Sequence, residues 1–206
     1  MEKELILIGA SGHAKVVLSV ALANQKKILG YFDDNPELLN QIFSNYSVLG
    51  DTSFLATHSG SAIFSMGNNA HRKKIAERHP LFTQWETLVH PSAIVHPSVK
   101  LGKGTVVFAG AIIQPDVVIG DHCIINTGAT VDHDCVIGNY VHLAPGVHLA
   151  GGVEVNEGAF LGIGSVVIPN LKIGEWSQIG AGGVVVNNIL AKKMVMGIPA
   201  KERIEC

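Results

Sequence analysis

A period of six residues decides the fold of this chain, and its first three repeats read AIVHPSVKLGKGTVVFAG at residues 93–110. The period continues to residue 188 and gives sixteen hexads without a slip. The third position of every hexad is Val, Leu or Ile, as in Val95, Val131 and Val185, and the first position is mostly small. A helix repeats about every 3.6 residues and a strand every two, so neither one explains this spacing.

A prism of short parallel strands does explain the six-residue period. Each hexad forms one short strand and turns a corner, and three hexads close a coil of eighteen residues. The aliphatic residue fills the axis, and the glycine that often follows it relaxes the turn. Neighbouring coils are then about 4.8 Å apart. The pattern predicts a parallel β-helix but not its handedness. The general crossover rule would give a right-handed coil.

Length and composition limit the possible domain organisation, partners and cellular location of the protein. The 206 residues shift in composition near residue 88, which predicts two domains at residues 1–87 and 88–206. A net charge of −2 gives no reason to expect a nucleic-acid or membrane partner. Cys123 and Cys135 occupy the small inward hexad position, which indicates packing residues in a reducing compartment. No apolar run reaches membrane-spanning length, so we expect a cytoplasmic protein.

The first ninety residues have the pattern of a small parallel α/β unit. Residues 5–8, 28–32 and 61–66 are expected to form strands, and helices are expected from Ala14 and after Asn69. Gly9 and Gly12 follow the first strand, where backbone amides and a helix N-terminus can approach a phosphate. A tight turn without any ligand is the alternative interpretation.

Polar residues near these turns favour a nucleotide-like ligand. Ser11 and His13 supply side-chain donors, and Asp33 ends the second strand, where a carboxylate can accept ribose hydroxyls. Gly67 and Asn68 stand at the carboxyl end of another strand, on the sheet edge where α/β ligands collect. The full dinucleotide fingerprint is missing, which argues against NAD.

The prism carries four histidines of interest: His122, His133, His142 and His148. Each can be a solvent-facing histidine, and we prefer that interpretation for His122. Their spacing is no metal signature in one chain, although a trimer could gather histidines from adjacent faces. His133 differs because Asp132 and Asp134 flank it. A neighbouring carboxylate fixes the imidazole tautomer and raises its basicity, as a general base requires.

The eighteen-residue coil places Gly151 directly over His133. A glycine there leaves its backbone amide open to a ligand. That amide is suitably placed to stabilise an oxyanion near the base.

Several motifs together resemble one enzyme family. They are Gly9-Ala10-Ser11-Gly12-His13, Asp33-Asp34, Gly67-Asn68-Asn69, Arg72-Lys73-Lys74-Ile75, Asn126-Thr127, His133-Asp134-Cys135-Val136-Ile137-Gly138 and Gly197-Ile198-Pro199-Ala200-Lys201. The chain resembles the sugar O/N-acyltransferases of the sialic-acid O-acetyltransferase type, most closely the nucleotide-4-amino-sugar N-acetyltransferases of the bacillosamine and perosamine pathways. The resemblance implies a Rossmann-like nucleotide-sugar domain, a left-handed β-helix, and a homotrimer that binds acetyl-CoA between subunits.

The resemblance also implies roles for particular residues. His133 is expected to take a proton from the 4-amino group, with Asp134 as its acidic partner, where the bacillosamine enzymes usually have Glu, and Asn126 beside it. The acetyl-CoA-binding residues implied are His142, Gly151, Ile163 and Lys201. The residues implied to bind the nucleotide sugar are Ser11, Gly12, His13, Asp33, Asp34, Gly67 and Asn68.

The sequence therefore predicts a cytoplasmic acetyltransferase of glycan biosynthesis. Acetyl-CoA and a nucleotide-linked 4-amino-4,6-dideoxy sugar are its expected substrates, the amine attacks the thioester directly, and no metal is expected. The alternatives are O-acetylation of a sugar such as sialic acid, a metal-dependent hydratase of the carbonic anhydrase type, and a non-catalytic nucleotide-sensing trimer. The nucleotide base and the sugar stereochemistry stay open.

Overall fold

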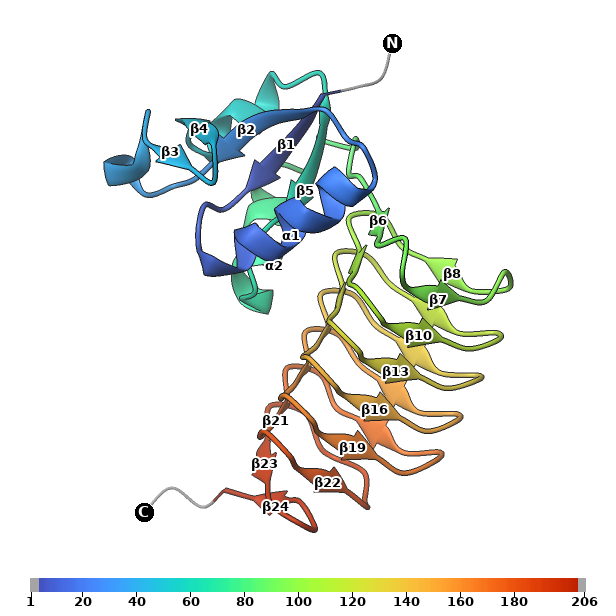
Figure 1. The fold of residues 1–206 in the computed structure, drawn as a ribbon. Coiled ribbons are helices and arrows are strands. Elements are labelled where there is room, and N and C mark those ends of the chain that lie inside the picture. The colour runs from blue at the N-terminus through green and yellow to red at the C-terminus, as the bar shows by residue number, and fades with distance from the viewer. Residues whose placement is uncertain (1–3, 204–206) are drawn as a thin grey trace.

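The structure, a computed structural model, describes residues 4–203 and shows two parts (Figure 1). The N-terminal part is a five-stranded sheet in the order β3-β4-β2-β1-β5. Its elements are β1 (Leu5–Ile8), α1 (Gly12–Ala23), β2 (Ile28–Phe32), a 3-10 turn (Pro36–Leu38), β3 (Ile42–Phe43), β4 (Tyr46–Gly50), a second 3-10 turn (Thr52–Ala56), β5 (Ser61–Phe64) and α2 (Asn69–Arg78). The three predicted strands and both predicted helices are confirmed, and the sequence analysis missed β3 and β4.

Strand β1 is buried on both faces because each face of the sheet is covered. Leu5 and Leu7 pack in one core cluster that contains α1 residues and prism residues. Ile6 and Ile8 belong to a second cluster on the other side, together with Ile75 of α2. This is why β1 reads as an unbroken apolar run rather than as an alternating strand.

The second part is the predicted prism, which begins one strand before the hexads at β6 (Leu88–Val89). The sixteen hexads give the sixteen strands β7 (Ile94–Val95), β8 (Lys100–Leu101), β9 (Val106–Val107), β10 (Ile112–Ile113), β11 (Val118–Ile119), β12 (Ile124–Ile125), β13 (Thr130–Val131), β14 (Val136–Ile137), β15 (His142–Leu143), β16 (His148–Leu149), β17 (Glu154–Val155), β18 (Phe160–Leu161), β19 (Val166–Val167), β20 (Lys172–Ile173), β21 (Gln178–Ile179) and β22 (Val184–Val185). A closing hairpin follows, β23 (Met194–Met196) and β24 (Lys201–Glu202).

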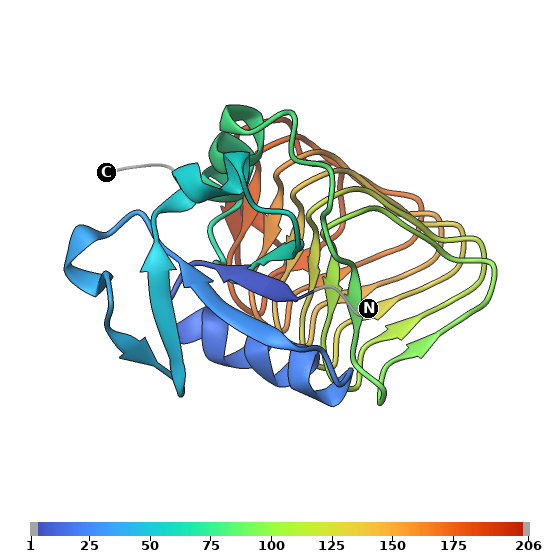
Figure 2. The same cartoon turned by 90° about the horizontal axis from the view of Figure 1, so that it is seen from above.

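The strands form three sheets, which are the faces of the prism. The docking face is β6-β9-β12-β15-β18-β21-β23-β24, the second face is β7 to β22 in steps of three, and the third face is β8 to β20 in steps of three. Ile112 pairs with Ile94 on one side and with Thr130 on the other, which confirms the eighteen-residue coil. From above, the coils stack and outline a triangle (Figure 2).

The axis of the prism is a continuous apolar column of the predicted inward residues. Aliphatic third-position residues from Val107 to Val185 are almost fully buried. Cys123 and Cys135 lie in this column as free, buried thiols, so their prediction as packing residues is confirmed. With the fold of the N-terminal part, this confirms the predicted α/β unit followed by a hexapeptide β-helix.

Arg72 of α2 fastens the N-terminal part to the prism. Its buried guanidinium donates to the carbonyl oxygens of His122 at 3.0 Å and Tyr140 at 2.9 Å, both on the prism. It also donates to the Gly67 carbonyl at 3.1 Å. Burial lowers the pKa of Arg72 to about 10, so the side chain is still a cation at neutral pH.

The preferred interpretation of His122 as a solvent-facing residue is wrong. Its side chain is buried, stacks on Tyr140 and contacts the rings of Phe64 and Trp85. The N-terminal part covers this corner of the prism, which the hexad pattern alone does not reveal. Burial, and then the charge of Arg72, lowers the pKa of His122 to about 3.

Candidate active site

His133 stands at the corner between β13 and β14, which we call the base corner (residues 132–134). Its Nδ1 lies 2.8 Å from Asp134 Oδ2, and its backbone N–H donates to Asp132 Oδ1 at 2.8 Å. The hydrogen bond with Asp134, and then the charge of Asp132, raises the pKa of His133. If Nδ1 carries the proton toward Asp134, Nε2 is left as a free base. The imidazole is well exposed to solvent.

Gly151 lies against the His133 ring, as the eighteen-residue coil predicts. A Cβ atom at Gly151 would be 2.6 Å from both Cε1 and Nε2 of His133, so only glycine fits beside the ring. Within residues 4–203, the Gly151 amide donates no hydrogen bond. An unpaired N–H beside a basic nitrogen has the arrangement that an oxyanion hole needs.

Asn126 and His142 lie together on the docking face and not at the base corner. His142 Nδ1 is 3.2 Å from the Gly67 carbonyl oxygen, so this nitrogen must be the donor. Nε2 then accepts from Asn126 Nδ2 at 3.1 Å. Burial, followed by the charge of Arg72, lowers the pKa of His142 to about 3, so the ring is neutral at physiological pH.

One whole prism face separates the two groups within a chain. Asn126 follows β12 on the docking face, and β13 on the second face comes between it and His133. The corner of Asn126 (residues 126–128), which we call the amide corner, therefore differs from the base corner. A single chain does not bring Asn126 beside the base.

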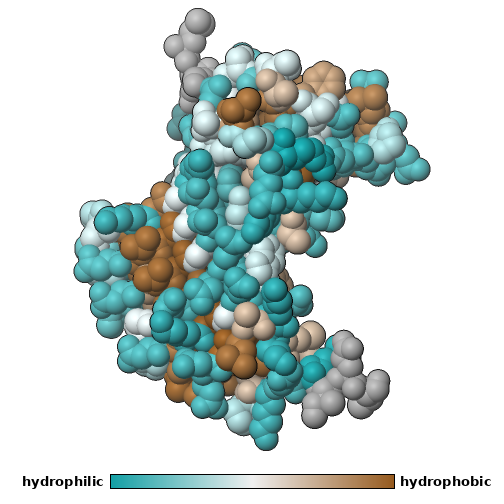
Figure 3. All heavy atoms as spheres, turned by 180° about the vertical axis from the view of Figure 1, so that it is seen from behind, coloured by the Kyte–Doolittle hydropathy of each residue, from teal (hydrophilic) through white to brown (hydrophobic). Residues whose placement is uncertain are grey.

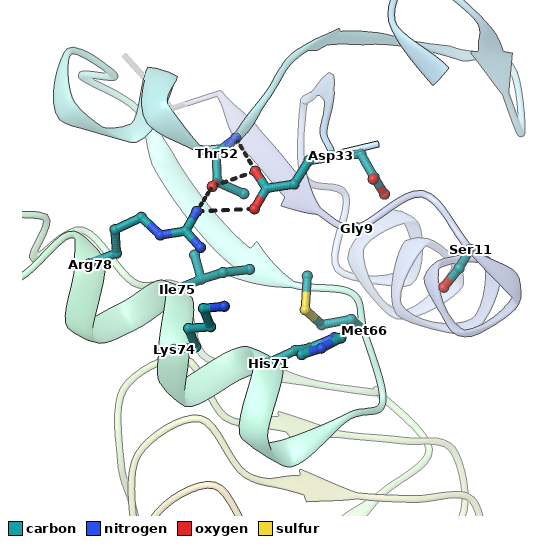
Figure 4. Close-up of a pocket in the computed structure, with 10 residues that line it drawn as sticks. Gly9, Ser11, Asp33, Thr52, Met66, His71, Lys74, Ile75 and Arg78 are labelled. Atoms are coloured by element: carbon teal, nitrogen blue, oxygen red, sulfur yellow. Dashed lines mark hydrogen bonds and ion pairs between the residues drawn. The ribbon is translucent and has the colours of Figure 1, made fainter. Parts of the chain in front are cut away.

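A cavity of about 320 Å³ opens at the carboxyl edge of the N-terminal sheet (Figure 4). Ser11, Asp33 and Asp34 of the predicted nucleotide-sugar residues line it. The lining residues to which the sequence analysis gave no role at the site are Thr52, Met66, His71, Lys74, Ile75 and Arg78, of which Lys74 and Ile75 were quoted only as part of a family motif. A signal for four of them was available, since positions 71, 74, 75 and 78 have the spacing of one helix face.

The adjacent carboxylates of Asp33 and Asp34 hydrogen-bond to the segments that surround this cavity. Asp33 Oδ2 accepts from the Ala10 N–H at 2.7 Å and thereby fixes the turn before α1. Asp34 Oδ1 accepts from the backbone N–H and the hydroxyl of Thr52, and Oδ2 pairs with Arg78 at 3.0 Å. Burial raises the pKa of Asp34, but the bonds from Thr52 and Arg78 outweigh it and the net shift is downward.

His13 links this cavity region to the docking face. It lies in the first turn of α1, where its ring is 5.8 Å from that of His142 and 5.5 Å from that of Phe108. Burial, and then the charge of Arg72, lowers the pKa of His13 to about 4. Gly12, beside it, has open space where a side chain would be, so a ligand can reach the N-terminus of α1.

The remaining predicted residues are spread along the chain. Gly67 and Asn68 lie before α2, outside the first cavity; Ile163 is an exposed corner residue; Lys201 is exposed in β24. Between residues 4 and 203, no three His, Cys, Asp or Glu side chains are grouped to hold a metal ion. No helix in the same range is long and apolar enough to cross a membrane.

Two family models match different parts of the chain. Residues 4–79 match the PglD N-terminal domain, and residues 98–133 and 116–151 match the bacterial transferase hexapeptide family. Among curated proteins, UDP-N-acetylbacillosamine N-acetyltransferase of Bacillus subtilis is 39% identical over 51% of this chain and 51% of its own length. The matched region spans about half, or less, of the curated relatives.

Solved structures match over nearly the whole chain. PerB of Caulobacter crescentus, in complex with CoA and GDP-perosamine, is 39% identical with a TM-score of 0.92, covering 98% of this chain and 97% of that one. The acetyltransferase domain of PglB from Neisseria gonorrhoeae, in complex with acetyl coenzyme A, is 34% identical with a TM-score of 0.90, covering 98% and 100%. The chain therefore belongs to the hexapeptide-repeat family of sugar N-acetyltransferases that includes PerB and the acetyltransferase domain of PglB.

Proposed function

We propose that the protein transfers the acetyl group of acetyl-CoA to the 4-amino group of a nucleotide-linked 4-amino-4,6-dideoxy sugar. The observation that carries the proposal is the pairing of His133 and Asp134 beneath the unpaired Gly151 amide. The complexes of PerB with CoA and GDP-perosamine and of PglB with acetyl coenzyme A support the two substrates.

The chemistry follows from the tautomer at the base corner. With Nδ1–H held by Asp134, His133 Nε2 can accept a proton from the amine as its nitrogen attacks the thioester carbonyl. The carbonyl oxygen gains negative charge, which the Gly151 N–H is positioned to stabilise. The tetrahedral adduct then collapses and the C–S bond breaks. The departing sulfur takes up the proton that His133 accepted from the amine, and CoA leaves as the thiol.

We propose that the complete site forms between subunits of a homotrimer. A single chain keeps Asn126 and His133 at different corners, and a neighbouring copy can present its amide corner to the base corner. Apolar side chains on the second and third faces, among them Val166 and Val136, are exposed in one chain and suited to such contacts. The hexapeptide family match supports this assembly.

We also propose a division of labour between the two domains: residues 1–87 carry the nucleotide-sugar site and residues 88–206 carry the acetyl-transfer site.

The substrates and the cysteines of the protein indicate where it works. Acetyl-CoA and nucleotide sugars are cytoplasmic metabolites, and the buried free thiols of Cys123 and Cys135 suit a reducing compartment. We therefore place the enzyme in the cytoplasm.

A thiol-release assay tests the proposal directly. Acetyl-CoA is incubated with a panel of UDP- and GDP-linked 4-amino sugars and with CMP-sialic acid as the hydroxyl acceptor. We expect CoA release with an amino sugar and a fall in kcat of about 10²- to 10⁴-fold in His133→Ala. His96→Ala, an exposed histidine of the first coil, is the matched control and should keep full activity. No turnover on any amino sugar would overturn the proposed substrate class.

A further inference from the structure

The second face of the prism has a row of outward side chains without any Lys, Arg, Asp or Glu. This row, which we call the uncharged row, consists of Ile94, Ile112, Thr130, His148, Val166 and Val184, paired in register from coil to coil. The same row of the third face contains Lys100, Glu154 and Lys172. Figure 1 shows the second face as a ladder that the N-terminal part does not cover. An exposed row of this composition is suited to contact with other copies of the chain.

The proposed trimer turns the uncharged row toward its threefold axis. The second face lies between the base corner and the amide corner, which are the two corners proposed to meet neighbouring subunits. In a closed ring of three, the face between the contacting corners points either to the axis or away from it. If it pointed away, the remaining corner, to which Arg72 binds at His122 and Tyr140, would lie on the axis, and three N-terminal parts would collide there. The second face therefore points inward.

His148 is the residue of this row that can bind a metal ion. Its side chain is exposed in the single chain, and its Nδ1 lies 2.8 Å from Thr130 Oγ1, one coil earlier. Its Nε2 makes no hydrogen bond within residues 4–203. The threonine hydroxyl can accept from Nδ1–H, and the lone pair of Nε2 is then free. One hydrogen-bonded nitrogen and one free nitrogen is the usual arrangement of a histidine that binds a metal.

Threefold symmetry turns this histidine into a set of three. Equivalent atoms of the three subunits lie at one height around the axis, so a side chain that reaches the axis meets its own copies. Three neutral imidazoles with one open position are a known ligand set for tetrahedral Zn²⁺. The adjacent layers of Thr130 and Val166 add no charge. Mg²⁺ and Ca²⁺ prefer oxygen ligands, so a nitrogen set of this kind suits a transition metal.

We propose that three copies of His148 bind one divalent transition-metal ion, Zn²⁺, on the threefold axis of the trimer. Each Nε2 is a ligand, each Thr130 hydroxyl holds the opposite nitrogen, and a water molecule takes the fourth position. The ion joins the subunits and takes no part in acetyl transfer, because the base and amide corners lie at the edges of the second face. This inference rests on the proposed function, since it uses the trimer proposed there.

Titration of the untagged protein with Zn²⁺, after removal of bound metal, tests the inference. We expect calorimetry to give one ion per three chains, and Co²⁺ to give the visible absorption of a four-coordinate site at the same ratio. His148→Phe keeps a ring and removes both nitrogens, so it should lose this binding. His96→Ala is the matched control and should bind as the wild type does. It removes another exposed histidine whose Nδ1 is bonded to a hydroxyl, that of Ser98 at 2.9 Å.

Thr130→Val tests the hydrogen bond that orients His148. Valine has nearly the shape of threonine without its hydroxyl, so Nδ1 loses its partner. We expect the affinity for Zn²⁺ to fall about 10- to 100-fold while the ratio of one ion per three chains is kept. Zn²⁺ should also raise the melting temperature of the wild type and leave that of His148→Phe unchanged. If His148→Phe does not assemble, His148→Ala takes its place.

Three outcomes would overturn the inference. The first is a trimeric mass without any binding of Zn²⁺, and the second is equal binding by the wild type and both His148 variants. The third is one ion per chain, lost in His133→Ala and kept in His148→Phe, which would favour the metal-dependent hydratase instead. None of these measurements needs acetyl transfer, so a failure of the proposed reaction is seen separately as missing CoA release.

Discussion

At the scale of single residues, the contact between His133 and Gly151 could be predicted from the sequence, and the bonding partners of Asp34 could not. The eighteen-residue coil alone placed Gly151 over His133, because a stacked position is fixed by counting. The substrate-binding role of Asp34 stays a prediction; the structure adds that its carboxylate accepts hydrogen bonds from Thr52 and pairs with Arg78. Thr52 and Arg78 are far from Asp34 in the sequence, so no local sequence pattern predicts these contacts.

Replacing Asp134 with Asn should change the pH dependence of the reaction. Asp134 has a φ of 60°, a conformation that Asn tolerates well, so the backbone should not change. Activity requires neutral His133 and is lost as the pH falls through its pKa. Because Asp134 raises that pKa, we expect the acid limb of kcat/KM to move to lower pH in the variant.

The plateau rate at high pH should fall in the same Asp134→Asn variant, because the base is weaker and less well oriented. The pH profile of kcat/KM measures both effects. An acid limb that stays in place would show that Asp134 does not tune the base. Asp116→Asn, another left-handed corner residue one coil earlier, is the matched control and should leave the profile unchanged.

Gly151→Ala should impair catalysis and spare the fold. The three atoms nearest to the new Cβ all belong to the His133 ring, which is exposed and can rotate away. We expect kcat to fall about 10- to 100-fold, with little change in melting temperature. In a His133→Ala background the same substitution should have almost no further effect, because the clashing ring is gone. Independent, multiplicative losses in that double variant would argue against the contact.

At the scale of elements, the prism was predicted strand by strand, whereas the hairpin β3–β4 was missed. The hexads carry one aliphatic residue at each inward position, and sixteen repetitions leave no ambiguity. The hairpin has short strands joined by Ser44 and Asn45, both with positive φ. Such two-residue turns favour Asn-Gly, and a Ser-Asn pair between short apolar runs gives a weak signal.

The joint between α2 and the prism depends on Arg72. Arg72→Met should lower the free energy of unfolding by about 2–4 kcal/mol, because the carbonyls of His122 and Tyr140 lose a charged donor while buried. Chemical denaturation measures the change. Lys100→Met, at an exposed strand position, should alter stability little. Equal stability of both variants would show that α2 is held by apolar contacts alone.

At the scale of the whole molecule, the assembly could not be derived from one chain. The period gives each residue its face and height, yet it says nothing about which face meets a neighbour. Figure 3 shows apolar patches on the prism surface, and the amide and base corners stay apart within one chain. The family resemblance, and not the spacing, suggested the intersubunit site.

Subunit complementation tests the proposed trimer. His133→Ala removes the base, and Asn126→Ala alters the amide corner. Equal amounts of the two inactive variants, unfolded and refolded together, should recover about a quarter of wild-type activity, because one site in four pairs an intact base with an intact amide corner. Each variant refolded alone is the control. No recovery, in material of trimeric mass, would place both corners in one subunit's site.

The stacking of the coils also makes the prism a screw with a fixed pitch. An insertion of eighteen residues is a pure translation, which moves every later side chain about 4.8 Å along the axis and keeps it on its face. An insertion of six preserves the apolar core but rotates everything after it to the next face. An inserted coil therefore leaves the chemistry undisturbed only where it falls outside residues 133–151 and outside the coils that α2 contacts, because an insertion between His133 and Gly151 would separate the two. A single extra hexad between the amide and base corners would instead move His133 to a different face of the prism.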